Sequence, residues 1–365
     1  MVCEMDFVDE CYAGKDLSLL KKLTLVIPTY NRNFYLSRCL WYHAHFPFGQ
    51  IIVADSSPEE KKVVNLETVA KIEELFGVDI LYLEYEPETE KYGGDIYRKW
   101  GDAVMHVETE YSQICTDKEF YVPTTLCRLI NFLEDNPDYT VGSGLFTNYA
   151  NSLQKIYSSR ESITNSDALQ RYCRALKQGW NQSQLLSLHR ANIQKKIYKP
   201  IITSEINDIR FGERYVAFIA YAYGKMYHVN CPYNLRDIEK IRNKDQSINK
   251  DESSTLRYPQ LVEYDKEADY YQHSYEGCHR AILQLLSENG CYDPDELEVA
   301  WTNVIEPILT RNAMSYPNNV SFRLTIAKKI VPQFVLNIYR KRGAIVPDKE
   351  SAVILNILQD YCLQQ

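Results

Sequence analysis

The sequence of 365 residues predicts an α/β fold, in which a mostly parallel sheet is flanked by helices and followed by an α-helical C-terminal domain. Two observations predict this fold. Short apolar runs rich in β-forming residues alternate with helix-length stretches in the first third of the chain, which is the pattern of βαβ units. The last third shows only helical patterns. We therefore expect one large domain and a smaller helical one.

Four short runs are expected to form neighbouring buried strands, over residues 23–27, 51–54, 80–83 and 111–115. Pro28 directly follows the first run and is expected to stop it. Helices are expected between the strands, over residues 34–46, 59–76 and 93–107, and Gly77 should end the second helix. Because such crossovers are right-handed, the strands should lie parallel, and ligands bind beyond the carboxyl ends of strands in sheets of this kind.

The rest of the chain is less regular. Strands are expected over residues 139–148, 185–189 and 226–229, and helices over 166–177 and within 201–223. Four further helices are expected over residues 261–287, 294–312, 319–341 and 349–363. The predicted divisions are a lead-in helix (1–21), an α/β domain (22–236), a polar linker or surface loop (237–254) and a helical domain (255–365).

Composition and charge argue against several classes of protein. A net charge of -8 argues against a general nucleic-acid binder, which needs a basic surface. The chain has no run of 18 apolar residues, and its acidic start lacks the regions of a signal peptide, so we expect a cytoplasmic protein without a transmembrane helix. The ten cysteines never occur as C-x-x-C, which predicts reduced, buried thiols and neither a zinc site nor a disulfide framework.

The segment 115–123 contains the most informative residues. Asp117 and Glu119 follow the fourth expected strand, and Pro123 begins a helix. Side chains two residues apart at the end of a strand point to the same side of the chain. Two carboxylates in this position suit a hard divalent cation that keeps positions open for phosphate oxygens. An Asp-x-Glu alone is also compatible with a solvated acidic turn, so the surrounding sequence decides between the two interpretations.

Three segments in this order resemble the nucleotide-sugar-dependent glycosyltransferases of the GT-A fold. Residues 27–32, Ile-Pro-Thr-Tyr-Asn-Arg, look like the P-x-Y-N-R end of their first strand, and residues 53–57, Val-Ala-Asp-Ser-Ser, are similar to the acidic end of their second strand. Residues 115–123 closely resemble the C-A-D-D-D-F-Y-V-P motif of the subgroup named simply "glycosyltransferase domain". Residues 94–99 and 133–139 match the flanking pattern of that subgroup, and the resemblance covers roughly residues 22–236.

The resemblance implies a Rossmann-like GT-A domain that transfers a sugar from a nucleotide-diphosphate donor, with UDP-sugars favoured. It implies that the acceptor is a hydroxyl of a growing glycan or of a lipid-linked carrier, as in the synthesis of polysaccharides such as a capsule or another cell-surface glycan. It also implies inversion at the anomeric carbon.

The resemblance assigns a donor site as well. The residues expected around the nucleotide are Pro28, Tyr30, Asn31, Arg32, Asp55, Asp95, Lys99 and Lys118. Asp55 is expected to accept hydrogen bonds from the base, commonly uracil, and Arg32 can form bidentate contacts with a phosphate. Each assignment has an ordinary alternative. Asp55 could cap the next helix, Arg32 could form a surface ion pair, and Asp95 and Lys99 could form a salt bridge one helical turn apart.

The resemblance places a divalent cation, Mn²⁺ or Mg²⁺, on Asp117 and Glu119. This chain departs from the family at the middle position, where Lys118 replaces an acidic residue. The outer carboxylates are kept, and metal binding by an Asp-x-Glu is chemically reasonable. Lys118 could instead lie against the diphosphate as a point charge and reduce the need for metal.

An inverting transferase needs a carboxylate that removes the proton of the acceptor hydroxyl as the anomeric carbon is attacked. The candidates near the helix expected around residue 210 are Glu205, Asp208 and Glu213. Glu213 fits the spacing of the subgroup best, because an apolar run and Gly224 follow it, and Asp208 comes second. Helix starts attract acidic residues for electrostatic reasons, so at least two of the three are expected to have only that role.

Two other functions remain open. A sugar-nucleotide nucleotidyltransferase uses a related sheet, but residues 28–33 contain no glycine for its triphosphate loop. A catalytically inactive GT-A-like protein that binds sugars or nucleotides would be compatible with Lys118. The C-terminal helices carry no motif, so we consider packing on the catalytic domain, homodimerisation, and peripheral contact with the acceptor or an anionic membrane surface through basic clusters at 328–329 and 340–342.

Overall fold

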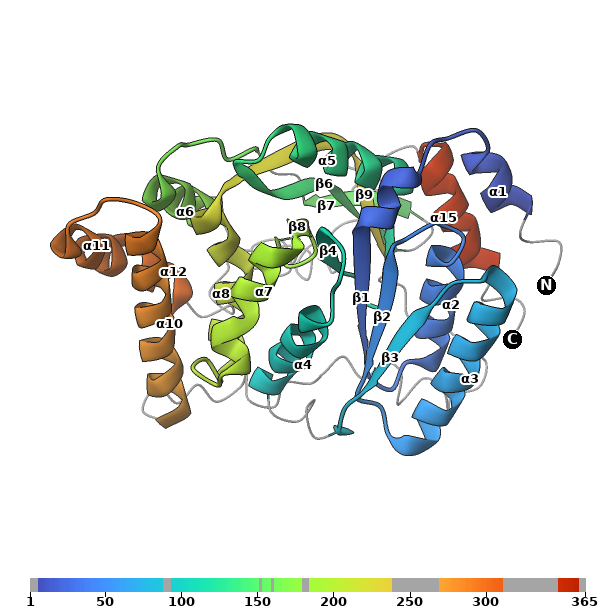
Figure 1. Ribbon diagram of the computed structural model, residues 1–365, viewed down its shortest axis with the longest axis horizontal. Coiled ribbons are helices and arrows are strands. Elements are labelled where there is room, and N and C mark those ends of the chain that lie inside the picture. The colour runs from blue at the N-terminus through green and yellow to red at the C-terminus, as the bar shows by residue number, and fades with distance from the viewer. Residues whose placement is uncertain are drawn as a thin grey trace, which may run out of the picture.

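A nine-stranded mixed sheet forms the centre of the protein and is flanked by helices (Figure 1). The structure is a computed structural model that describes residues 6–87, 93–150, 153–158, 161–178, 184–237, 269–310 and 347–360. The α/β class predicted from the sequence is confirmed. The expected linker after residue 237, the helix over 319–341 and the two basic clusters lie outside the described residues.

The first half of the sheet is parallel. In spatial order it contains β3 (Ile80–Glu84), β2 (Gln50–Asp55), β1 (Leu23–Thr29) and β4 (Tyr111–Ile114). The strands are joined by α2 (Asn33–His43), α3 (Glu59–Phe76) and α4 (Gly93–Met105). The order 3-2-1-4 is that of Rossmann-type sheets. The four predicted strands and the three helices between them are confirmed to within a few residues at their ends.

The strand β1 continues past Pro28, where the sequence predicted its end. Pro28 is in register with Ala54 of β2, and Thr29 is in register with Asp55. The proline is accommodated because the pairing of β1 with β4 has already ended at Val26, so that no bond on that side requires its missing N–H. The extension brings Thr29 to the carboxyl end of the strand.

The second half of the sheet is mixed, so the prediction of a mostly parallel sheet holds only for the first half. It contains β8 (Leu188–Arg190), β6 (Tyr139–Ala150), β9 (Lys225–Asp237) and β5 (Glu119–Tyr121), with β7 (Leu153–Ser158) beside β6. β6 and β9 pair in parallel, whereas β4 with β8, β8 with β6, β6 with β7 and β9 with β5 are antiparallel. The sequence predicts only a short part of β9 and does not predict β5. Their pairing places Glu119 opposite Arg236.

Four helices belong to this second half: α5 (Pro123–Asp135), α6 (Ala168–Lys177), α7 (Ala191–Ile202) and α8 (Ile209–Tyr223). The helix predicted within residues 201–223 corresponds to α8, and residues 201 and 202 instead end α7. Ser204, with a φ of 64°, lies in the turn between the two helices. Glu205 and Asp208 lie between this turn and α8, and Glu213 lies within α8.

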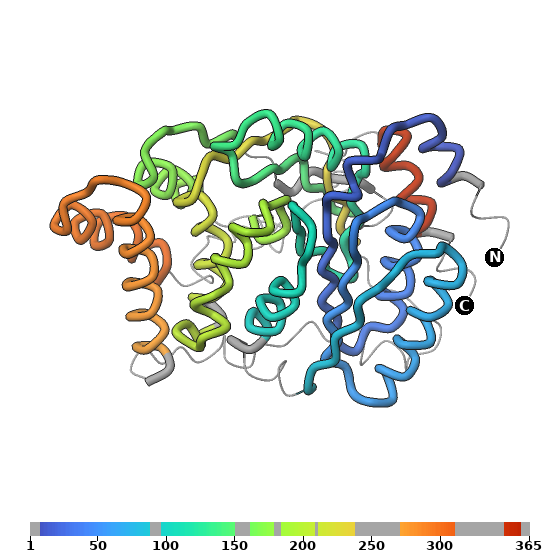
Figure 2. Tube along the Cα trace, viewed as in Figure 1, coloured from blue at the N-terminus to red at the C-terminus, as the bar shows by residue number. Residues whose placement is uncertain are grey.

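The described helices near the C-terminus pack in two separate places (Figure 2). α10 (Asp269–Glu288), α11 (Pro294–Ala300), the π-helical turn η6 (Trp301–Ile305) and α12 (Glu306–Leu309) form a group beside α8. α15 (Lys349–Asp360) packs instead against α1 (Asp6–Tyr12), close to the short helix η2 (Ser18–Lys22) that stands where the lead-in helix is expected. The domain boundaries stay predictions. Within the described ranges, no helix is both long and apolar enough to cross a membrane.

Candidate functional site

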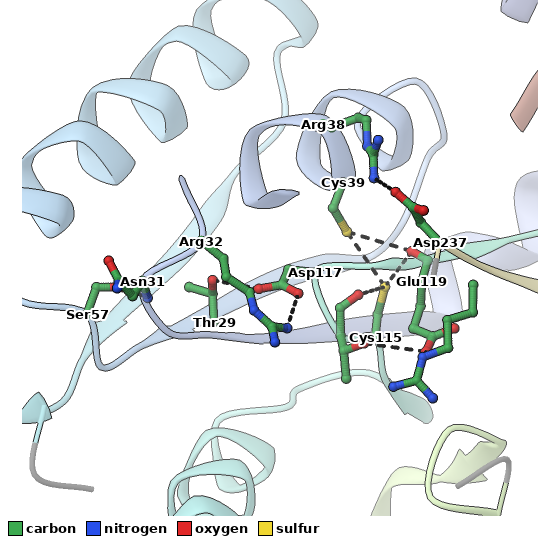
Figure 3. A network of polar contacts seen from close by, with 12 residues as sticks. Thr29, Asn31, Arg32, Arg38, Cys39, Ser57, Cys115, Asp117, Glu119 and Asp237 are labelled. Carbon is green, nitrogen blue, oxygen red and sulfur yellow. Dashed lines mark hydrogen bonds and ion pairs between the residues drawn. The ribbon is translucent and has the colours of Figure 1, made fainter. Parts of the chain in front are cut away.

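The loops that follow β1 and β2 are joined at the carboxyl edge of the sheet. Asn31 has a left-handed backbone, with a φ of 55°, and its backbone N–H donates to Ser57 Oγ at 2.8 Å. Asparagine is one of the few residues other than glycine that tolerate this conformation. In Figure 3, Asn31 and Ser57 lie on one side of Asp117, and Glu119 lies on the opposite side of Asp117. The loops that follow β1, β2 and β4 therefore lie together at this edge of the sheet.

Asp117 lies in the turn after β4 and is buried. Its Oδ2 accepts a hydrogen bond from Thr29 Oγ1 at 3.0 Å, and its Oδ1 forms an ion pair with Arg32 Nη1 at 3.1 Å (Figure 3). The Arg32 side chain is 24% exposed, whereas that of Asp117 is 2% exposed. Both oxygens of Asp117 are thus occupied by protein donors, and the arginine lies on the solvent side of the pair.

Glu119 forms the second carboxylate–guanidinium pair of the site. It is fully buried in β5, and its Oε1 lies 3.2 Å from Arg236 Nε, whose side chain is 27% exposed. Its Oε2 has no hydrogen-bond partner among the residues that the structure describes. Burial raises the pKa of the Glu119 carboxyl, and the charge of Arg236 acts in the opposite direction.

Lys118 stands between the two carboxylates in sequence but has different contacts. Its ammonium lies 4.2 Å from the centre of the Tyr35 ring, and the side chain is half-buried. Burial lowers the pKa of Lys118, the charges of Arg32 and, more weakly, Arg236 act in the same direction, and those of Asp117 and Asp237 act against it. Lys118 stands in the chain between Asp117 and Glu119, which pair with Arg32 and Arg236, so the three cations belong to one short segment and its partners.

A third ion pair holds the end of β9 against α2. Arg38 Nη2 and Asp237 Oδ2 are 2.5 Å apart, and both side chains are buried (Figure 3). The Arg38 guanidinium also lies over three aromatic rings of α2 and β5. The backbone N–H of Asp237 donates to Lys118 O at 3.0 Å. This pair therefore fixes the backbone of the loop that carries Lys118.

Asp55 is the hydrogen-bond centre of the loop after β2. Its Oδ1 accepts a bond from the backbone N–H of Ser57 at 2.7 Å. Its Oδ2 accepts bonds from Asn65 Nδ2 at 2.6 Å and from Tyr82 OH at 2.5 Å. The carboxylate is fully buried and its three donors are uncharged. Contact with a base therefore requires that Tyr82 or Asn65 give up its bond.

The structure places the other residues predicted around the nucleotide at varying distances from the loops. Lys99, on α4, is buried and donates to Thr29 O at 3.2 Å and to Ser56 Oγ at 2.7 Å, so it ties the end of β1 to the loop after β2. Tyr30 lies in the turn after β1, next to Pro28 and Thr29 of the strand. Asp95 lies in the first turn of α4, but its side chain is outside the described part of the chain.

Glu213 lies in the first half of α8 and is half-buried. Burial raises the pKa of its carboxyl to about 7, although a hydrogen bond with Tyr97 and the charges of Arg214 and Arg236 lower it. The part of α8 that carries Glu213 packs against Tyr97 of α4, the helix that also carries Lys99. A carboxyl with a pKa close to the working pH suits a general base.

The other two candidate bases have ordinary structural partners. Asp208 is buried, and its Oδ1 accepts a bond from the backbone N–H of Phe211 at 3.4 Å, which caps α8. Glu205 accepts a bond from Thr203 Oγ1 at 3.0 Å and pairs with Arg280 at 3.8 Å. Glu213 is therefore the stronger candidate.

The expected metal ligands do not fit a divalent cation in this arrangement. Both oxygens of Asp117 and one of Glu119 are occupied, and two of the occupying groups are guanidinium groups that repel a cation. Of the four carboxylate oxygens of Asp117 and Glu119, only Oε2 of Glu119 has no hydrogen-bond partner among the described residues. Metal binding at this loop would require Arg32 and Arg236 to move, so the use of metal stays a prediction.

Three side chains of metal-ligand type, Cys39, His43 and Cys115, meet beneath the loop and are buried. The ring of His43 is engaged on both nitrogens. Nδ1 lies 2.9 Å from the backbone oxygen of Cys39, to which it donates, and Nε2 faces the backbone N–H of Tyr121 at 3.5 Å. We interpret the group as part of the core. Every cysteine in the described ranges is a free thiol.

No protein-family model matches the chain, and no curated protein matches it either. Among solved structures, the crystal structure of S. aureus TarS 1-349 in complex with UDP-GlcNAc aligns with a TM-score of 0.48 and 14% identity, covering 94% of this chain and 92% of that chain. The complex of the same fragment with UDP aligns with a TM-score of 0.44 and 13% identity over the same shares. These values are too low to identify a family, so the function is inferred from the residues of this chain.

The sequence did not indicate Arg38, Arg236 or Asp237 as residues of the site. Arg236 and Asp237 lie at the end of β9, and their partners lie far away along the chain, on β5 and α2. In the sequence, nothing distinguishes Arg236 and Asp237, at the end of the expected domain, from charged residues that form an ion pair at the protein surface.

Proposed function

We propose that the protein is a glycosyltransferase that moves a sugar from a nucleotide-diphosphate donor, with UDP-sugars favoured, to a hydroxyl of a growing glycan or lipid-linked acceptor. The observation that carries this proposal is the position of Glu213. It lies in the first half of α8, which packs against α4, the helix that carries Lys99, and burial raises the pKa of its carboxyl to about 7. Sugar transfer from a diphosphate needs both a base and cations, and the chain offers Glu213 for the first and Arg32, Lys118 and Arg236 for the second.

In the proposed reaction, the acceptor oxygen attacks the anomeric carbon, and the bond from that carbon to the diphosphate breaks. The ionised carboxylate of Glu213 takes the proton of the acceptor hydroxyl. The electron pair of the broken bond leaves on the nucleoside diphosphate, whose added negative charge faces Arg32, Lys118 and Arg236. Attack on the face opposite the leaving group inverts the anomeric carbon, as the resemblance implies.

The donor would lie across the two joined loops, with its base toward Asp55. Asp55 would exchange the bond from Tyr82 or Asn65 for one from the base, which costs little because all these donors are neutral. Lys99 would be a positioning residue, because its ammonium donates to the backbone oxygen of Thr29 and so fixes the end of β1, from which the donor loop begins.

The divalent cation, Mn²⁺ or Mg²⁺, is retained as a prediction of the family resemblance. Asp117 and Glu119 would hold it if Arg32 and Arg236 turned toward the phosphates. When bound, it would neutralise charge on the leaving diphosphate. A cytoplasmic location, homodimerisation and peripheral contact with a membrane also stay predictions.

A second candidate is a catalytically inactive protein that binds nucleotides or sugars through the same loops. It is favoured by the pairing of both outer carboxylates with arginines, which leaves neither Asp117 nor Glu119 as an open metal site. In this case Glu213 would be a partly buried acid without a substrate.

Calorimetry and a turnover assay test the proposal. UDP, GDP, CDP and dTDP are titrated with and without Mn²⁺, and release of nucleotide from the matching sugar donor is then followed. Binding of one nucleotide, with turnover that is lost in Glu213→Gln while binding survives, supports the transferase. Binding without turnover of any donor supports the inactive protein. If none of the four nucleotides binds, both candidates are wrong.

A further inference from the structure

We propose that the loop 117–119 holds the diphosphate of the donor through three cations, Arg32, Lys118 and Arg236, and needs no resident divalent cation. This inference rests on the proposed function, because it concerns how the same site binds its donor. The acidic side chains of the site are buried more deeply than the basic side chains that pair with them.

The carboxylates of the loop lie beneath the arginines that they bind. Asp117 and Glu119 are 2% and 0% exposed, while Arg32 and Arg236 are 24% and 27% exposed. A ligand that arrives from solvent therefore meets guanidinium groups first. A guanidinium has five N–H donors and can contact a carboxylate and a phosphate at the same time. Each buried carboxylate thus holds one side of an arginine side chain and leaves its solvent side facing outward.

The charge balance of the loop favours an anion. Arg32, Lys118 and Arg236 carry three positive charges against the two negative charges of Asp117 and Glu119, which leaves an excess of one positive charge. A divalent cation would increase the excess instead.

The cations are held in place before a ligand binds, which lowers the entropic cost of binding. Each arginine is fixed by a buried carboxylate. The backbone of Lys118 is fixed by its bond from Asp237, and Asp237 is fixed by the buried Arg38. In this respect the loop resembles a built anion site.

Calorimetric titration of UDP and uridine, in EDTA and in Mn²⁺, separates the contribution of the diphosphate from that of the base. In EDTA, UDP should bind about 100-fold more tightly than uridine, the size expected for two charge-assisted hydrogen bonds. Mn²⁺ should change this ratio by less than about 2-fold, because the cations already supply the charge. Added NaCl should weaken the binding of UDP and not that of uridine.

Substitutions test the cations individually. Lys118→Gln and Arg236→Gln should each weaken UDP about 10-fold in EDTA and leave uridine unchanged, as expected for the loss of one hydrogen bond to a charged group. Arg174→Gln is the matched control, since it removes an exposed arginine of α6 that pairs with exposed Glu161. Glu119→Gln removes the expected metal ligand and keeps an amide oxygen that can accept from Arg236, so in EDTA it should weaken UDP less than Arg236→Gln does. Thermal melting confirms that each variant is folded.

The outcomes distinguish the two proposals. Nucleotide binding that requires Mn²⁺ and is lost in Glu119→Gln would overturn the inference and leave the proposed function standing. Unchanged UDP affinity in both cation variants would also overturn it. If neither UDP nor any other nucleotide binds in EDTA or in Mn²⁺, the proposed function itself fails and the inference fails with it.

Discussion

Two loops at the carboxyl edge of the sheet bury acidic side chains, yet they hold them in opposite ways. After β2, Asp55 accepts three hydrogen bonds, all from uncharged donors. After β4, Asp117 and Glu119 each pair with an arginine, and Lys118 adds a third cation. The first loop therefore keeps a buried negative charge, whereas the second has an excess of positive charge. The same sequence pattern, an acid at the end of a strand, thus has two different surroundings, and we propose that they suit different halves of one ligand.

The strength of the contacts differs in the same direction. A hydrogen bond from an uncharged donor to a carboxylate contributes about 1.5 to 3 kcal/mol net, so a donor to Asp55 can be given up where the base supplies another uncharged donor in its place. Pairs of guanidinium and carboxylate groups are stronger and have directional, double-donor geometry. The loop after β2 can therefore rearrange around a ligand, while the loop after β4 is expected to receive one as it stands.

The largest expected effect is at Glu213, the candidate base on α8. Glu213→Gln should lower kcat by about 10²- to 10⁴-fold, because the acceptor proton has no base to take it. The affinity for UDP should stay unchanged. In the wild type, kcat/KM should rise with pH and level off above about 7, since only the ionised carboxylate accepts a proton. A pH–rate profile of both proteins checks this, and a variant that retains turnover would show that Glu213 is not the base.

The same carboxyl should affect stability with a defined sign. Because burial raises its pKa in the folded protein from 4.5 to about 7, ionisation of Glu213 opposes folding. Its cost should appear between pH 4.5 and pH 7 and be complete above that range. Glu213→Gln should thus be more stable than the wild type at pH 8, by about 2 to 3 kcal/mol. At pH 4 the two proteins should unfold at the same urea concentration.

The next effect tests whether the cationic loop is held by charge. Asp237→Asn leaves the buried Arg38 without a counter-charge and should lower the free energy of unfolding by about 3 to 5 kcal/mol. Asp138→Asn is the control, because Asp138 pairs with Lys225 at the surface and its loss should cost less than about 1 kcal/mol. Urea denaturation measures both. Equal, small changes would show that the buried pair does not hold the loop.

The smallest effect concerns the loop after β2. Tyr82→Phe removes one of the three donors to Asp55 and should lower the free energy of unfolding by about 1.5 kcal/mol, the lower end of the range for a bond to a charged group. The affinity for uridine should not fall, because the base is proposed to take the place of this donor. A clear fall in uridine affinity would instead indicate that Tyr82 contacts the base itself.

The sequence predicted well those parts of the fold that depend on local pattern. β1 is buried along its whole length, so it appears as a continuous apolar run, and the helix over residues 59–76 ends at Gly77 with a φ of 65°. The carboxyl ends of these strands also placed Asp55 and Asp117 at one edge of the sheet. These features require only neighbouring residues to be recognised.

The contacts that define the site could not be predicted in this way. The partner of Asp117 lies 85 residues earlier in the chain, and Arg236 meets Glu119 only because β9 returns along β5. The sequences of β5 and β9 carry no periodic pattern that would predict their pairing, because β5 has only three residues and β9 pairs with two different strands. Lys118 indicated that charge was altered at the motif, but the two arginines beside it become visible only in three dimensions.

The central claim is that the loop after β2 binds the base and that the loop after β4 binds the diphosphate. The most direct test is calorimetric titration of uridine and UDP into Asp55→Asn, Arg236→Gln and the double variant. Asp55→Asn should weaken uridine and UDP by the same factor, while Arg236→Gln should weaken UDP alone. The two effects on UDP should add, because the sites are separate. Equal weakening of uridine and UDP by Arg236→Gln, or no effect of Asp55→Asn on either ligand, would contradict the account.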